Sequence, residues 1–139
     1  MTQRVLILCT GNSCRSQMAE GLWRERANEQ WEALSAGSRP AGYVHPLAVK
    51  VMDEVGVDIR NQESKPISAL AGKSFDLVVT VCDSAKETCP VMPGAKKWLH
   101  WSFTDPADAE GDDDTKLEAF REVRDQINSR IEKFLADGV

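Results

Sequence analysis

Three side chains with complementary chemistry lie close together near the start of the chain: Cys9, Arg15 and Ser16. A thiolate is a strong nucleophile. The planar fork of a guanidinium grips two oxygens of a tetrahedral anion. A serine hydroxyl can donate a hydrogen bond to the sulfur and so make it a better leaving group in a later step. This combination predicts nucleophilic displacement at phosphorus or arsenic.

The residues between Cys9 and Arg15 can form the binding site for such an anion. Gly11 and Asn12 tolerate left-handed backbone, so the loop can turn its peptide N–H groups inward. The predicted oxyanion-binding residues are Thr10, Gly11, Asn12, Ser13, Cys14 and Arg15. The dipole of a following helix also favours a thiolate at Cys9. Taken alone, Cys9 would be a small buried residue at a strand end, and we interpret Cys14 as such a packed bystander.

These side chains must be positioned by alternating strands and helices. Apolar runs predict strands over residues 5–9, 31–36, 75–81 and 97–101, and helical periodicity appears over 16–27, 46–55 and 117–134, with a further short element over 65–70. This order predicts an α/β fold: one domain over residues 1–139, a three-layer sandwich with a four-stranded parallel sheet flanked by helices. Cys9 and Cys82 each end a strand, so both are expected at the ligand-binding edge of the sheet.

Composition narrows the function classes. The chain has 139 residues, a net charge of −5 and no basic stripe, which argues against nucleic-acid binding. No run is long enough to span a membrane, and no leader is evident, so we expect a cytoplasmic protein whose thiols are reduced. Four cysteines in that setting indicate reactivity or metal binding. His45 and His100 form no paired ligand motif, so we expect neither a zinc site nor a cofactor.

Residues 9–16 resemble the Cys-x5-Arg-Ser phosphate loop of low-molecular-weight protein tyrosine phosphatases. Within that superfamily, CTGNSCRSQMAEG (residues 9–21) is similar to the arsenate reductases built on the phosphatase fold. The similarity continues through Ser35-Ala36-Gly37, the strand that ends at Cys82, and Thr104-Asp105-Pro106. It implies a low-molecular-weight phosphatase-like domain that reduces arsenate to arsenite.

The resemblance also implies an order of events. Cys9 attacks arsenate, with Asp105 as the general acid, and Cys82 then attacks the sulfur of Cys9 and releases arsenite. Cys89 attacks Cys82 in turn, which leaves a Cys82–Cys89 disulfide for thioredoxin, or for a glutathione and glutaredoxin route, to reduce. Residues 83–94 would have to rearrange during this relay. Phosphate and sulfate are expected to compete with arsenate, and a monomer is expected.

Two other functions are compatible with the loop. A phosphatase acting on phosphotyrosine or small phosphoesters needs the same loop, but it has no need of Cys82 and Cys89. A non-enzymatic oxyanion and redox sensor could use both cysteines, but Asp105 would then be superfluous.

Some of the reductases that this chain resembles hold a potassium ion near the loop. The matching positions here are Asn12, Glu20, Ser35 and Lys65. An ammonium group stands at Lys65, where a carboxylate would be expected. We therefore predict no bound metal and no potassium requirement.

Overall fold

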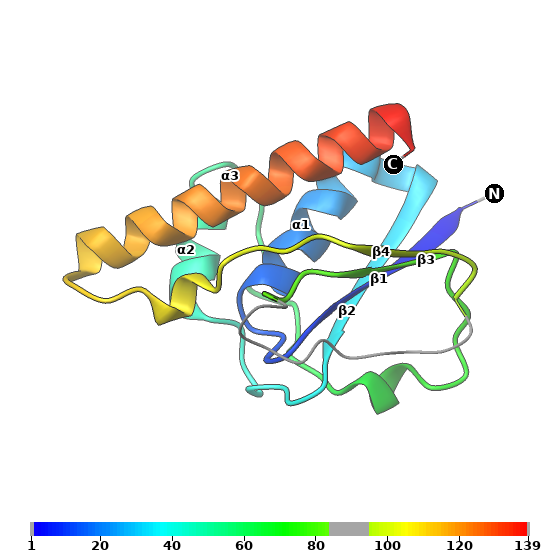
Figure 1. Ribbon diagram of the computed structural model, residues 1–139, viewed down its shortest axis with the longest axis horizontal. Coiled ribbons are helices and arrows are strands. Elements are labelled where there is room, and N and C mark those ends of the chain that lie inside the picture. Colours follow the sequence, from blue (N-terminus) through cyan, green and yellow to red (C-terminus); the bar gives the residue numbers. More distant parts are fainter. Residues whose placement is uncertain (1, 84–94, 139) are drawn as a thin grey trace.

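Four parallel strands form the centre of the molecule. The structure is a computed structural model that describes residues 2–83 and 95–138. The strands are β1 (Gln3–Cys9), β2 (Trp31–Gly37), β3 (Leu77–Thr80) and β4 (Trp98–His100), in the order β2-β1-β3-β4 (Figure 1). All three pairings are parallel. The predicted α/β fold with a four-stranded parallel sheet is therefore confirmed.

The register brings the carboxyl ends of the central strands to one edge. Cys9 lies opposite Gly37 on β2, and Leu8 lies opposite Thr80 on β3. Strand β3 is shorter than the predicted run over 75–81, but the N–H of Val81 still donates to the carbonyl of Leu8 at 2.9 Å. The pairing thus reaches almost to Cys82, which places this cysteine at the same edge as the end of β1.

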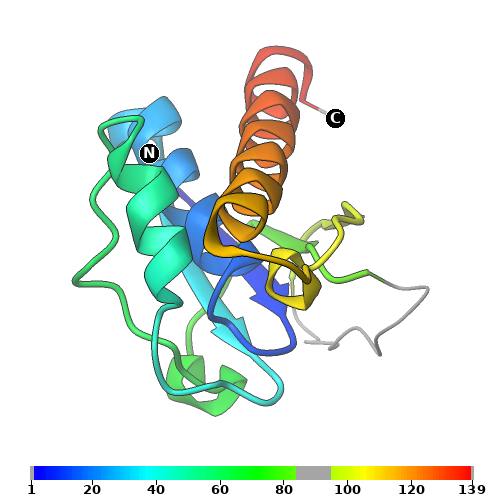
Figure 2. The same cartoon turned by 90° about the vertical axis from the view of Figure 1, so that its left-hand side faces the viewer.

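Three α-helices cover one face of the sheet (Figures 1 and 2). They are α1 (Arg15–Ala27), α2 (Pro46–Asp53) and α3 (Asp113–Asp137). Helix α3 begins four residues before the predicted start because the Asp112 carboxylate accepts the N–H of Thr115 at 2.8 Å and caps its first turn. The core on this face includes an aromatic group in which Trp23 stacks on Trp101, with centroids 5.7 Å apart.

The opposite face carries a smaller core. Leu6, Leu8 and Val78 pack there against Leu70 and Phe75. The short element predicted over residues 65–70 is the 3₁₀ helix η2 (Ile67–Leu70), which lies on this side of the sheet. The layers are therefore unequal: the α-helices gather on one face, and a single 3₁₀ turn stands against the other in the part that the structure describes. In that same part, no helix is long and apolar enough to cross a membrane.

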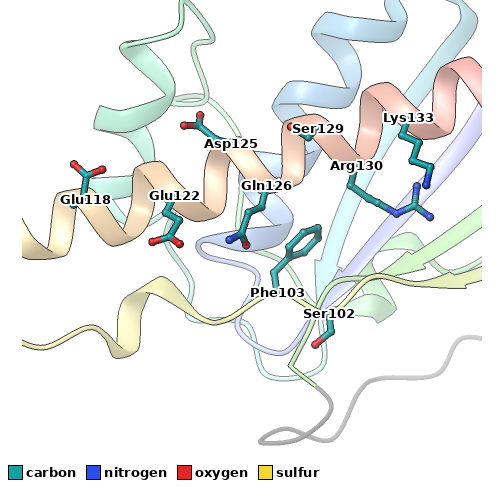
Figure 3. Close-up of a pocket in the computed structure, with 9 residues that line it drawn as sticks. All are labelled: Ser102, Phe103, Glu118, Glu122, Asp125, Gln126, Ser129, Arg130 and Lys133. Carbon is teal, nitrogen blue, oxygen red and sulfur yellow. The ribbon is translucent and has the colours of Figure 1, made fainter.

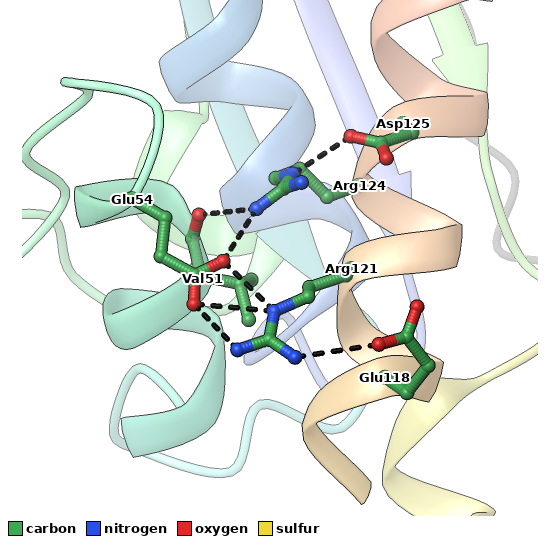
Figure 4. A network of polar contacts seen from close by, with 6 residues as sticks. All are labelled: Val51, Glu54, Glu118, Arg121, Arg124 and Asp125. Atoms are coloured by element: carbon green, nitrogen blue, oxygen red, sulfur yellow. Dashed lines mark hydrogen bonds and ion pairs between the residues drawn. The ribbon is translucent and has the colours of Figure 1, made fainter. Parts of the chain in front are cut away.

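An ion-pair network joins the end of α2 to α3 (Figure 4). The Glu54 carboxylate accepts hydrogen bonds from Arg121 at 2.8 Å and from Arg124 at 2.9 Å, and Arg124 also donates to the carbonyl of Val51. Hydrogen bonding to Arg121, joined by that to Arg124, lowers the pKa of Glu54 from 4.5 to about 2. The network therefore holds α2 against α3 while Glu54 is ionised.

Replacing Glu54 by glutamine should lower the free energy of unfolding by about 1 kcal/mol at neutral pH, the scale of partly exposed ion pairs. A carboxyl whose folded pKa is depressed stabilises the protein above its unfolded pKa, near 4.5, and loses that effect as the pH falls toward 2. The difference between the two proteins should thus shrink over this range in urea titrations. Glu118→Gln, which removes only a 3.3 Å surface pair with Arg121, should have little effect.

Candidate active site

Hydrogen bonds to its backbone carbonyl oxygens hold the loop between β1 and α1 in place. Residues of the neighbouring loop donate backbone N–H groups to four of them: Ser38 to Cys9, Arg39 to Thr10, Ala41 to Gly11 and His45 to Ser13, at 2.8–3.3 Å. The fifth, that of Asn12, accepts from the Gln17 side chain at 2.9 Å. In a trans peptide the N–H points opposite to the C=O. The outward carbonyls therefore turn the N–H groups that follow them toward the inside of the loop, which makes an anion cradle.

Asn12 braces this cradle from within. Its side chain is fully buried, its φ is +49°, and its amide donates to the hydroxyls of Ser16 at 2.8 Å and Ser35 at 2.9 Å. The amide oxygen accepts the backbone N–H of Lys65 at 2.9 Å. One asparagine thus ties the loop to α1, to β2 and to the segment before η2, and it adopts the left-handed backbone that the sequence predicted.

Gly37 leaves room for this arrangement. A Cβ atom at Gly37 would lie 2.5 Å from the carbonyl oxygen of Thr10 and 3.0 Å from the Cβ of Asn12. The first of these distances is shorter than real Cβ contacts, and the second is at their lower limit. Strand β2 therefore ends on a glycine because the oxyanion loop packs directly against it.

Arg15 is the first residue of α1, and its side chain is almost completely buried. One terminal nitrogen donates to the carbonyl of Phe103 at 3.1 Å, and the other lies 3.4 Å from a carboxylate oxygen of Asp105. The second oxygen of Asp105 accepts the N–H of Ala107 at 3.0 Å and caps the 3₁₀ helix η3 (Pro106–Asp108). The structure therefore brings Asp105 to the predicted arginine, 90 residues away in sequence.

Cys14 differs from Cys9 in its environment. It is 4% exposed, and burial raises the pKa of its thiol to about 12, even though a hydrogen bond with Ser13 and the charge of Arg15 act against that rise. The negative charge of Asp105 raises the pKa further. Cys14 is thus a neutral thiol inside the loop.

The two remaining cysteines belong to the segment after β3. Cys82 is completely buried and follows Val81, whose N–H bonds to Leu8 next to Cys9. Cys9 and Cys14 are outside any disulfide, whereas Cys82 is disulfide-bonded. Cys89 lies outside the described residues, as does most of the segment 83–94 that we expect to rearrange. A buried cysteine therefore lies two residues beyond β3, the strand beside the one that leads into the oxyanion loop.

The chain matches the family model described as low molecular weight phosphotyrosine protein phosphatase over residues 4–137. It belongs to this phosphatase family. It is 48% identical over 139 residues to an arsenate reductase of Halalkalibacterium halodurans, with 99% of each chain covered.

Solved structures of similar proteins show the same fold. An arsenate reductase from Archaeoglobus fulgidus matches with a TM-score of 0.80 and 29% identity, covering 96% of this chain and 99% of the other. A thioredoxin-dependent arsenate reductase from Corynebacterium glutamicum matches with a TM-score of 0.71 and 30% identity, covering 97% of this chain and 61% of that one.

Behind the oxyanion loop of this phosphatase-family chain lies a second polar cluster. Ser35 donates to the Glu20 carboxylate at 2.6 Å, and Glu20 is 6% exposed. Burial raises the pKa of Glu20, while the hydrogen bond from Ser35 and the charge of Lys65 act to lower it. The Lys65 ammonium donates to the carbonyl of Glu63 at 3.3 Å. Arg24 lies 3.7 Å from the second carboxylate oxygen of Glu20, so the charges of Arg24 and Lys65, both of the protein itself, already act on this carboxylate.

The melting temperature and turnover should consequently be the same in potassium and in sodium at equal ionic strength. Lys65→Asp should destabilise the protein in sodium, because two carboxylates then share the site. Part of that loss should return in potassium. A clear potassium dependence of the unsubstituted protein would contradict this expectation.

A groove of about 760 Å³ lies between α3 and residues 102–103 (Figure 3). The Phe103 ring reaches toward α3, while the Phe103 carbonyl holds Arg15. The lining of the groove carries carboxylates toward one end of α3, and it carries Arg130 and Lys133 toward the other end. Among the described residues that line the groove there is no cysteine. The described residues that line the groove include none from the oxyanion loop, so the groove is separate from the cradle.

The sequence pointed to the loop, Arg15 and Asp105, which the structure places together and whose roles stay a prediction, but not to three supporting groups. These are the carbonyl of Phe103, the side chain of Gln17 and the small size of Gly37. A carbonyl carries no sequence signal. Gly37, however, follows the predicted second strand directly, at the level where Cys9 ends the first, and this position could have indicated close packing.

Proposed function

We propose that this phosphatase-family protein reduces arsenate to arsenite. The observation that carries the proposal is the position of Cys82: this buried cysteine follows Val81, which still pairs with Leu8 of β1, and the next residue of β1 is Cys9. Displacement at phosphorus needs the cradle and one thiol, whereas reduction needs a second thiol close to the first. The similarity to the arsenate reductase of Halalkalibacterium halodurans supports this choice.

In the first step the Cys9 thiolate attacks arsenate held by the loop N–H groups and Arg15. A sulfur–arsenic bond forms, and one arsenate oxygen leaves as water with a proton from Asp105. Asp105 can reach the departing oxygen because it lies 3.4 Å from Arg15, which would bind the same anion. The Ser16 hydroxyl accepts a hydrogen bond from the Asn12 amide. It can donate its own hydrogen bond to the Cys9 sulfur.

In the second step Cys82 attacks the Cys9 sulfur. A Cys9–Cys82 bond forms, the sulfur–arsenic bond breaks, and its electron pair stays on arsenic, which becomes arsenite. Cys89 then attacks Cys82, releases the Cys9 thiolate and leaves a Cys82–Cys89 disulfide. An external dithiol protein returns both cysteines to thiols. We propose thioredoxin for this step, because the Corynebacterium glutamicum arsenate reductase of similar fold is thioredoxin-dependent. We also propose that the protein acts in the cytoplasm.

A phosphatase acting on phosphotyrosine or small phosphoesters is the second candidate function, since the family description names that activity. The cradle suits phosphate as well as arsenate. A phosphatase would hydrolyse its cysteine intermediate with water and would leave Cys82 unused.

The deciding experiment couples the protein to arsenate, thioredoxin, thioredoxin reductase and NADPH. Sustained NADPH consumption that depends on arsenate is expected, and Cys9→Ser should abolish it. Hydrolysis of an aryl phosphate without any arsenate-dependent NADPH consumption would establish the phosphatase instead. A single round of oxidation without arsenite release would indicate a sensor.

A further inference from the structure

A threonine and a histidine share a short hydrogen bond close to Cys82. The hydroxyl oxygen of Thr80 lies 2.6 Å from Nδ1 of His100, and the two residues are direct partners in the pairing of β3 with β4. Thr80 is 5% exposed, whereas His100 is exposed on the edge strand. Neither residue takes part in the oxyanion loop, so the pair needs another explanation.

The alternation of β3 puts this pair on the same side of the strand as Cys82. Val79 and Val81 pack into the core under the α-helices, while Val78 packs into the smaller core on the other face. Thr80 follows the alternation of Val78, and Val81, one residue beyond β3, still pairs with Leu8, so continued alternation directs Cys82 to the side of Thr80. In extended backbone, Cβ atoms two residues apart are separated by about 7 Å. A thiol and a hydroxyl span this distance when they lean toward each other.

Cys82 requires a proton acceptor for its part in the proposed reaction. In its reduced form the thiol must lose its proton before it attacks another sulfur. Cys82 is completely buried, and burial penalises the charged form of a thiol. Imidazole is the side chain best suited to take up a proton near neutral pH. The neighbouring Thr80–His100 pair offers an imidazole. Its Nδ1 is hydrogen-bonded to the buried Thr80, and the residue is exposed to solvent.

We propose that the Thr80–His100 pair takes up the proton that Cys82 loses before it attacks Cys9. This proposal rests on the proposed reduction of arsenate. The Thr80 hydroxyl accepts the thiol proton and passes its own to Nδ1 of His100. The Cys82 thiolate then forms the bond to the Cys9 sulfur, and the sulfur–arsenic pair passes to arsenic. The exposed imidazolium returns its proton to solvent.

In the described part of the chain, Lys96, Asp76 and Arg130 have partners away from the pair. Lys96 pairs with Asp76 at the amino end of β3, and Arg130 stacks on Trp101 over the helix-covered face. Asp83 follows Cys82 directly in the chain. Among the described residues, Asp83 is thus the charged residue closest to Cys82 in the sequence.

The test uses a full-length protein in which Cys82 is the one remaining thiol, with Cys9→Ser, Cys14→Ser and Cys89→Ser. Thiolate absorbance is titrated against pH, and the rate of alkylation by iodoacetamide is measured at neutral pH. Thr80→Val and His100→Gln should each move the titration midpoint up by about one pH unit and slow alkylation about tenfold. Thr80→Ser, which keeps the hydroxyl, should behave as the parent.

Equal midpoints in the parent, Thr80→Val and His100→Gln would overturn the proposal. His100 is exposed, so His100→Gln remains informative if Thr80→Val fails to fold. No arsenate enters the measurement, so its outcome is independent of the assay for arsenate reduction. A shifted midpoint in a protein that reduces no arsenate would refute the proposed function and leave the proton transfer intact.

Discussion

Replacing Cys89 by serine should give a protein that releases about one arsenite per chain and then stops. Arsenite can still leave, because its release needs only Cys9 and Cys82. The Cys9–Cys82 disulfide then has no resolving thiol, so the nucleophile stays blocked. Quenched-flow measurement of arsenite, together with mass spectrometry of the trapped disulfide, would check both points.

Cys14→Ser is the matched control for this experiment. Its thiol has a pKa of about 12 and stays neutral, so its loss should leave turnover nearly unchanged. Normal turnover by Cys89→Ser would show that the three-cysteine relay is wrong. A strong loss in Cys14→Ser would contradict the interpretation of Cys14 as a bystander.

Asn12→Ala should cost about 3 kcal/mol of unfolding free energy or more and should sharply weaken oxyanion binding. The variant leaves the Lys65 N–H without its buried acceptor, and it removes the amide that donates to Ser16 and Ser35. Each buried polar group that is left unsatisfied costs about 1–3 kcal/mol. Alanine at φ +49° adds a backbone penalty of about 1 kcal/mol. Urea unfolding, and the rise in melting temperature on adding phosphate, measure the two effects.

Asn28→Ala is the control for the stability cost of placing alanine at a positive φ. Asn28 also has a positive φ, +50°, but it lies exposed at the end of α1. Its ψ is −124°, in a strained region outside the left-handed one, so Asn28→Ala should lose about 1 kcal/mol or more and keep its response to phosphate. If Asn12→Ala lost no more stability than Asn28→Ala, the bracing role of the Asn12 amide would be refuted.

The sheet and the oxyanion loop could be predicted because both rest on local patterns. The run from Val5 to Cys9 is apolar without interruption, as a central parallel strand requires, and Gly11 and Asn12 follow it at once. Cys82 could be placed at the same edge because the parallel topology brings the carboxyl ends of strands together. These inferences need only residue types and order.

Contacts between distant segments could not be predicted from local patterns of this kind. The bonds from residues 38–45 to the loop carbonyls join backbone groups, which every residue carries. The anchoring of Arg15 by the carbonyl of Phe103 depends on where the chain runs after β4. The start of α3 shifted because a single cap, Asp112, decided it, while the apolar periodicity begins only at Leu117. The unequal layers likewise follow from where the connections pass, which periodicity does not encode.

The outward carbonyls of residues 9–13 bear on how this chain could have evolved. The hydrogen bonds to these carbonyls come from α1 and the loop from 38 to 45, whereas Cys82 belongs to the segment that follows β3. Substitutions around residue 82 can therefore add or remove a second thiol while the anion site stays intact. An ancestral hydrolase could have acquired electron-transfer chemistry in this way, without passing through an inactive form.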